Sequence, residues 1–236
     1  MLNVWIVAKR ELQAYFVSPI AYVITAAFLV IAGYLFSMIL YYSREATLQY
    51  LFLNMTTILL LIAPVLTMRL LAEERSKGTI ELLLTSPVRD WEVTLGKYLA
   101  SLGLFAAMLA LTVYYPVLLE VYGSPDRGPI LSGYLGVFLL GATLLALGLL
   151  TSSLTSNQIV AAVLGFVLIL CLWLVDAVSG IIGGTVGEAL KYLALSSHFS
   201  DSARGIIDTR DVIYALSLIV GSLFVTTRVL EMRRWR

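Results

Sequence analysis

The chain has 236 residues, of which 60% are hydrophobic and 13% are charged, and its mean hydropathy is +0.92. This composition excludes a water-soluble globular protein and indicates an integral membrane protein. The net charge of +1 gives no reason to expect a nucleic-acid partner. Cys171 is the single cysteine, so the sequence can form neither an intramolecular disulfide nor a cysteine metal cluster.

Residues 1–17 are predicted to form an amphipathic helix that lies in the membrane interface. Its apolar positions are Trp5, Ala8, Leu12, Tyr15 and Phe16, and its polar positions include Lys9, Arg10 and Gln13. Ser18 and Pro19 end this helix. A simple juxtamembrane stub is the alternative interpretation. We expect the N-terminus to be retained, because the following apolar run is long enough to span and no signal-peptide cleavage site precedes it.

Six uncharged runs are long enough to cross a bilayer, which takes about 20 apolar residues. The predicted spans are 20–42, 46–68, 98–119, 131–152, 157–176 and 212–230. The uncharged stretch of residues 130–175 is too long for one crossing, so it is divided near Ser152. The last span is short, and Arg228 is expected to snorkel from its end. Gly141 and Gly148 give the fourth span a small-residue face, which serves either packing within the chain or dimerisation.

The segments between spans differ in charge. Residues 69–97 hold the densest charge of the chain and are predicted to form a loop with helical parts. Residues 177–211 form a second structured loop. Its first part, residues 177–187, is apolar but short and rich in glycine, and Gly180 is expected to break it. A partly inserted or re-entrant segment fits this pattern.

The distribution of Lys and Arg predicts the orientation. One face of a six-span arrangement collects eleven such residues: Lys9, Arg10, Arg69, Arg75, Lys77, Arg89, Lys97, Arg228, Arg233, Arg234 and Arg236. The other face receives five: Arg44, Arg127, Lys191, Arg204 and Arg210. Because positive loops face the cytoplasm, both termini and residues 69–97 are predicted to be cytoplasmic, and residues 177–211 to lie outside.

Several kinds of chemistry are excluded. No Walker motif G-x-x-x-x-G-K-[ST] is present, so the chain is not expected to hydrolyse ATP. An intramembrane serine protease needs a histidine beside a serine, but the single histidine, His198, lies in the outer loop and is expected to be a surface residue. The interiors of the predicted spans contain no Asp, Glu, Lys or Arg, and Asp176 and Arg228 lie at span ends. This disfavours an ion-coupled carrier and favours an apolar or amphiphilic cargo. We predict no catalytic and no metal-binding residues.

The charged segment is predicted to bind a soluble partner. Glu73, Glu74 and Arg75 continue the second span as a charged stalk, and Gly78 ends it. A short helix capped by Thr79 follows, with Ile80, Glu81, Leu82, Leu83 and Leu84. Ser86 and Pro87 are predicted to begin the helix that leads to Lys97. An ordinary charged loop, with its leucines on lipid headgroups, explains the same pattern.

Four motifs resemble one family. The run E-E-R-S-K-G-T-I-E-L-L-L-T-S-P-V (Glu73–Val88), followed by Gly96 and Lys97, resembles the cytoplasmic loop of type-2 ABC exporter permeases, in which this segment forms the coupling helix. K-R-E-L from Lys9, S-P-I-A-Y from Ser18 and R-G-I-I-D-T-R-D-V-I-Y from Arg204 are similar to its gliding-motility-type branch.

The resemblance implies a permease subunit that pairs with a second permease protomer, identical or related, and with two ABC ATPase subunits on separate chains. ATP and Mg would bind those ATPases, which would also rest against the interface helix at Trp5, Lys9, Arg10 and Glu11. It further implies an inner-membrane location, short extracellular helices before the last span and, in some relatives, an accessory membrane protein. A membrane anchor that recruits a soluble protein without moving cargo is the competing interpretation; an intramembrane enzyme is a third.

Overall fold

The structure is a computed structural model that describes residues 2–79, 88–182, 184–203, 206 and 208–234. All regular elements within these residues are helices. They are α1 (Leu2–Val17), α2 (Pro19–Ser43), α3 (Gln49–Thr67), α4 (Arg69–Ser76), α6 (Asp90–Leu111), α7 (Tyr114–Tyr122), α8 (Arg127–Leu154), α9 (Gln158–Ile182), α10 (Gly184–Leu193), α11 (Leu195–Ala203) and α12 (Thr209–Arg234). Six helical stretches are long and apolar enough to cross a membrane. The prediction of an all-α protein with six spans is confirmed.

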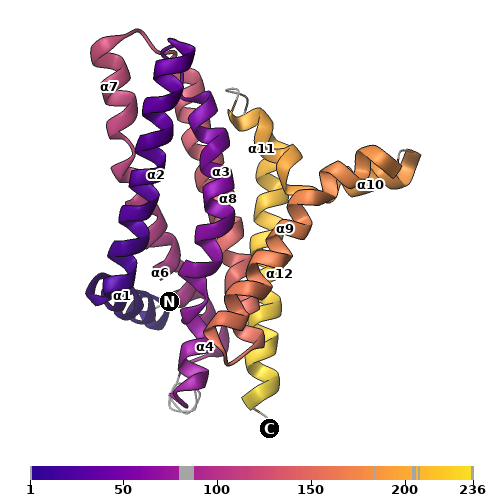
Figure 1. Cartoon of the computed structure of the whole chain (residues 1–236). Coiled ribbons are helices and arrows are strands. Elements are labelled where there is room, and N and C mark those ends of the chain that lie inside the picture. The colour runs from indigo at the N-terminus through magenta and orange to yellow at the C-terminus, as the bar shows by residue number, and fades with distance from the viewer. Residues whose placement is uncertain (1, 80–87, 183, 204–205, 207, 235–236) are drawn as a thin grey trace.

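The spans form an up-and-down bundle (Figure 1). Helix α1 lies across one end of the bundle, the end at which α4 and the C-terminal end of α12 also lie. We call this end, which carries both termini, the basal end. Helices α7 and α11 lie at the opposite end, the distal end, and α10 projects sideways from the bundle. The short helices predicted before the last span are therefore present as α10 and α11.

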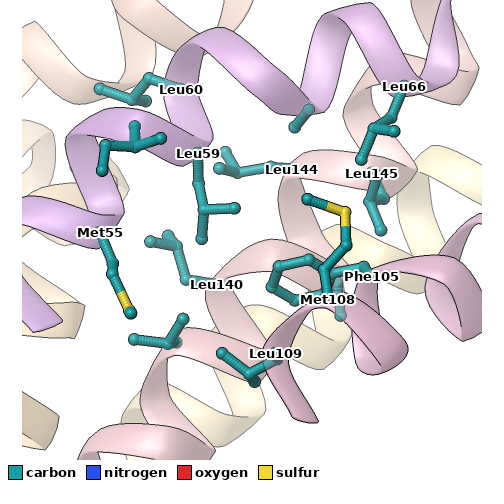
Figure 2. Packing of buried hydrophobic residues seen from close by; sticks show 14 of the residues in the cluster. Met55, Leu59, Leu60, Leu66, Phe105, Met108, Leu109, Leu140, Leu144 and Leu145 are labelled. Atoms are coloured by element: carbon teal, nitrogen blue, oxygen red, sulfur yellow. The ribbon is translucent and has the colours of Figure 1, made fainter. Parts of the chain in front are cut away.

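Helix α8 occupies the centre of the bundle and packs against α3, α6, α9 and α12. Apolar side chains of α3, α6 and α8 fill the space between these helices (Figure 2), including Leu59, Met108 and Leu144, which are at most 1% exposed. The glycines of α8 lie where a neighbour comes close. Gly141 faces the ring of Phe105 and Gly148 faces Thr67. This small-residue face therefore serves packing within the chain.

Gly141→Ala is expected to lower the free energy of unfolding by about 1–3 kcal/mol, the usual cost of overpacking a core. A Cβ atom at this position would lie 2.2 Å from Cε1 of Phe105, whose ring is itself enclosed at 1% exposure. Gly221→Ala in α12 is the matched control, because a Cβ atom there meets nothing within 4 Å. Thermal unfolding in detergent micelles measures both variants; equal midpoints would contradict the close approach of α6 and α8.

The predicted third span, residues 98–119, is not one continuous helix. It is divided into α6 and α7 by a turn at Thr112 and Val113. Pro116 has no N–H and cannot donate to the carbonyl of Thr112, which a continuous helix would require. The hydroxyl of Tyr134 in α8 donates to this carbonyl instead, at 2.8 Å. The break is thus hydrogen-bonded within the protein.

The fifth span is longer than predicted. Helix α9 continues past Asp176 and through Gly180 to Ile182, so the predicted break at Gly180 is wrong. A glycine inside a helix costs only about 1 kcal/mol relative to alanine, which the surrounding apolar sequence tolerates. The chain turns at Gly184, whose φ of +65° suits glycine, and α10 begins there.

Helices α2 and α9 are the most exposed spans, with only 17% of their apolar windows buried. Large apolar side chains cover their outer faces, as expected for surfaces in contact with lipid. Exposed tyrosines lie at the distal end: Tyr41, Tyr42 and Tyr122 are 77%, 74% and 85% exposed. Such side chains are typical of the boundary between membrane and water.

Candidate functional site

The site begins where the second span continues into the charged segment. Helix α3 ends at Thr67 and α4 begins at Arg69, so the first N–H groups of α4 lack partners within the helix. The hydroxyl of Ser152 in α8 accepts from the N–H groups of Leu71 and Ala72, both at 3.1 Å, and donates to the carbonyl of Met68 at 3.0 Å. A side chain of a different helix therefore caps α4 and fixes its direction.

Ion pairs run along the outer face of α4. Arg69 Nε donates to Glu73 at 2.7 Å and Lys77 Nζ to the same carboxylate at 2.6 Å. Arg69 Nη1 also donates to Ser18 Oγ, at the junction of α1 and α2. The hydrogen bond from Arg69, with help from Lys77, lowers the pKa of Glu73 to about 2. Glu73 is therefore an anion at any cytoplasmic pH, and its charge is balanced within the chain.

A buried lysine connects three helices of the site. The side chain of Lys97, in the second turn of α6, is only 1% exposed. Its Nζ lies 3.0 Å from Oε1 of Glu11 in α1 and 2.8 Å from Oε1 of Glu74 in α4. Arg10 lies 3.1 Å from Glu11 and 3.7 Å from Glu74, but is 58% exposed. These four residues, which we call the basal charge cluster, balance two anions with two cations.

Helix α1 packs closely along α6 through Val4, Val7 and Ala8, which are buried. A Cβ atom on Gly96 would lie 2.8 Å from Val7, so only glycine permits this approach. The face that packs on α6 is not the whole predicted apolar face, because Trp5 is 70% exposed. Trp5 lies on the outer side of α1, where it is available to lipid.

Helix α6 begins at Asp90, not at Pro87 as predicted. Arg89 is extended, with φ −79° and ψ 145°, and takes the N-cap position. Its N–H donates to Oε2 of Glu92 at 3.0 Å, and Asn3 of α1 donates to the same oxygen. The carboxylate of Glu92 thus caps the helix and holds α1 against it. Ser86 and Pro87 lie outside the described residues.

A cavity of about 340 Å³ opens between α1, α4 and the start of α6. Its polar lining includes Glu11, Ser18, Arg69, Glu73, Glu74, Lys77, Thr79 and Lys97. Tyr15 also lines it and donates to the carbonyl of Leu66 at 2.8 Å. Burial, together with nearby Glu11, raises the pKa of the Tyr15 phenol, so this group stays protonated and acts as a donor.

The structure describes only part of the predicted docking surface. Glu73, Glu74 and Arg75 belong to α4, and Arg75 donates to the carbonyl of Thr155 beyond α8. Gly78 turns the chain with φ +68°, and Thr79 is exposed. The other predicted docking residues lie outside the described residues: Ile80, Glu81, Leu82, Leu83, Leu84 and Pro87. In the interface helix, Lys9 and Arg10 are exposed and Glu11 belongs to the basal charge cluster.

Sequence reasoning missed the two residues that organise this site. Lys97 entered the sequence analysis as one of eleven positive residues of one face and as part of the family resemblance, with no structural role, and Ser152 only as a place to divide a long apolar run. One signal was available: Lys97 follows directly on Gly96, and a glycine at the start of an apolar helix indicates close approach of another element. Nothing local identifies Ser152, because its partners are 80 to 84 residues away in sequence.

His198 does not form part of this site and is not a surface residue. Its ring is 2.7 Å from Asp211 and stacks on Tyr214, with the ring centroids 4.1 Å apart. Its side chain is only 14% exposed. The prediction of an exposed polar histidine is therefore corrected. His198 holds α11 against the start of α12 at the distal end.

Six helices that are long and apolar enough to span a membrane indicate a multi-pass membrane protein. The chain belongs to the ABC-2 transporter family: the sequence profile of the ABC-2 family transporter protein matches residues 8–200. The proteins named "Probable multidrug ABC transporter permease YbhR" of Escherichia coli strains K12 and O157:H7 are each 34% identical over 87 residues. That alignment covers 37% of this chain and 23% of each relative. The gliding-motility-type branch stays a prediction.

Proposed function

We propose that the chain is the permease subunit of an ABC exporter and that separate ATPase subunits drive alternating access through residues 77–89, which we call the docking segment. The match of residues 8–200 to the ABC-2 family is the observation that carries this proposal. ATP and Mg bind the ATPases, because this sequence has no Walker motif. ATP binding closes the ATPases, the docked segments move with them, and the spans open or close a path.

The basal end faces the cytoplasm in this proposal. The larger group of Lys and Arg residues belongs to α1, α4, the segment that follows it, the start of α6 and the end of α12, which lie together at this end. By the positive-inside rule this end is cytoplasmic. Both termini and the docking segment are then accessible to a soluble ATPase at the inner face of the cell membrane.

Apolar anchors supply most of the affinity for the ATPase. The carboxylates of Glu73 and Glu74 are engaged with cations of this chain, so their pairing with a partner would have to compete with existing ion pairs. No ion pair has to be broken for the uncharged side chains of Ile80, Leu82, Leu83 and Leu84 to bind a partner. Buried apolar side chains are the usual energetic centre of an interface, and surrounding charges set its register. Exposed Lys9 and Arg10 of α1 extend the contact.

The cargo is apolar or amphiphilic and passes between two permease protomers, identical or related. Charged groups of the described spans gather at helix ends, where they do not line a path for ions. The wide apolar faces of α2 and α9 offer surface for a second protomer, an accessory membrane protein or lipid. The exposed acidic and basic residues at the basal end suit the ATPases.

Replacing Leu82, Leu83 and Leu84 together with Gln is expected to abolish co-purification with an ABC ATPase chain that co-purifies with the unmodified permease. Each leucine side chain that becomes buried in the complex contributes about 1.5–3 kcal/mol of binding free energy, and the triple variant loses this contribution. Tyr122→Gln, at an 85% exposed distal position, is the control and should leave the complex intact.

Unchanged co-purification of the triple variant would contradict docking through this segment. The anchor interpretation is tested in the same complex. An anchor predicts that ATP and vanadate leave the arrangement of the spans unchanged, whereas a transporter predicts that they change it.

A further inference from the structure

An ion pair connects α4 and α6, the two helices between which the docking segment lies. Residues 77–89 leave α4 just after Glu74 and enter α6 shortly before Lys97. The ion pair between Glu74 and Lys97, at 2.8 Å, joins the helix before this segment to the helix after it. Lys97 pairs at the same time with Glu11 of α1 at 3.0 Å. One ammonium group therefore joins both ends of the segment to the interface helix.

This junction depends on charge more than on apolar packing. Helix α1 packs along α6, whereas α4 packs mainly on α8 and α9. The cavity of about 340 Å³ lies between α1, α4 and α6, where apolar side chains would otherwise meet. The carboxylates of Glu11 and Glu74 reach Lys97 beside this cavity. The ion pairs are thus the direct connection from α4 to α1.

Burial makes the connection stiff. Lys97 is 1% exposed and its two carboxylate partners are 16% and 18% exposed. Charges in such surroundings attract more strongly than in water, and removing a partner leaves an uncompensated buried charge. A force that displaces α4 must therefore either carry α1 with it or separate a buried ion pair. The ion pairs stay closed only if α1 and the start of α6 move with α4.

We propose that Lys97 is a positioning residue that couples α4, the base of α6 and the interface helix α1, so that these elements move together when the docking segment moves. The inference rests on the proposed function, because it assigns the route by which motion of the ATPase reaches the spans. We call the ion pairs of Lys97 with Glu11 and Glu74 the joint. The joint is present in the permease without its ATPase, so the joint and the proposed coupling to an ATPase can be tested separately.

Electron-electron distance measurements test the joint directly. Spin labels are attached at Gln13→Cys in α1 and Ser76→Cys in α4, both exposed positions, in a Cys171→Ser background. The permease, together with an ABC ATPase that co-purifies with it, is reconstituted in lipid nanodiscs, without nucleotide and trapped with ATP and vanadate. We expect one narrow distance peak in both states. Lys97→Gln should lose this single narrow peak and make the distance depend on nucleotide.

Two further variants make the result specific. Glu74→Gln removes the partner of Lys97 on α4 and leaves the pair of Lys97 and Glu11 intact. It should also lose the narrow peak and serves if Lys97→Gln fails to fold. Lys77→Gln removes a lysine that pairs within α4 and is 64% exposed, and it should keep the narrow peak. A narrow, nucleotide-independent peak in Lys97→Gln or in Glu74→Gln would overturn the joint.

The proposed function fails in a different way. If the permease binds no ATPase, or if trapping changes no distance between Ser76→Cys and a label at Ser124→Cys in the distal loop, the coupling proposal fails. The narrow peak of the isolated permease and its loss in Lys97→Gln would still establish the joint between α1 and α4.

Discussion

Lys97→Met is expected to lower the free energy of unfolding by about 3–5 kcal/mol, the cost of breaking a buried ion pair by removing one partner. Methionine keeps most of the volume of the side chain but leaves Glu11 and Glu74 facing each other without the amine between them. Arg10 compensates only in part, because it is 58% exposed and lies 3.7 Å from Glu74. Two like charges at a half-buried site then repel.

The measurement is the midpoint of thermal unfolding in detergent micelles at a fixed heating rate, with a drop on the order of 10 °C expected. Lys77→Met is the matched control. It removes an exposed partner of Glu73, and such i,i+4 pairs contribute about 0.3–0.5 kcal/mol. If both variants unfolded at the same temperature, the burial of the Lys97 side chain would be contradicted.

Ser152→Ala is expected to destabilise the protein by about 1–3 kcal/mol, the cost of leaving a buried polar group without its partner. The orphaned group is the N–H of Leu71 at the start of α4, because the N–H of Ala72 and the carbonyl of Met68 can still pair with each other within the helix. Without the cap, the first turn of α4 should open. The basal charge cluster then loses the fixed position of Glu74.

Ser153→Ala is a close control for this variant. Its hydroxyl is equally buried but donates to the carbonyl of Leu150 within its own helix, and that carbonyl keeps its place in the helical ladder. A change of less than about 0.5 kcal/mol is expected, as for substitutions that touch no special feature. Hydrogen exchange of α4 amides separates the two cases, with fast exchange expected only in Ser152→Ala. Slow exchange in both would refute a cap supplied by α8.

Hydropathy was sufficient to predict the six spans, because each span is a local property of a run of residues. The breaks within spans needed more than hydropathy. Pro116 signals the end of α6 in principle, but the hydrogen bond from Tyr134 to the carbonyl of Thr112 forms only in the folded bundle. At Gly180 a break was predicted where the helix continues. The low helix propensity of one glycine was outweighed by the apolar sequence around it in α9.

The sequence predicts the candidate site from the density of charge in one segment, but the pairing of those charges could not be predicted. Glu73 pairs within α4 at a spacing that the sequence makes visible. Glu74 pairs with a residue 23 positions away, and Glu11 with one 86 positions away. Such partners depend on how α1 and α4 cross α6, which is a property of the packed bundle. The sequence could therefore predict which residues carry charge there, but not which of them hold the site together.

The hydroxyl groups of α8, a helix described in full, have a consequence for what a cargo would meet. Each donates to a backbone carbonyl: Ser132 to Gly128, Tyr134 to Thr112, Thr143 to Leu139, Thr151 to Gly148, Ser152 to Met68 and Ser153 to Leu150. The hydroxyl protons of these six side chains are therefore already used in hydrogen bonds within the protein. The central helix of the bundle is therefore chemically closer to a hydrocarbon wall than its count of serine, threonine and tyrosine suggests, and it has no idle hydroxyl proton with which to solvate an anion.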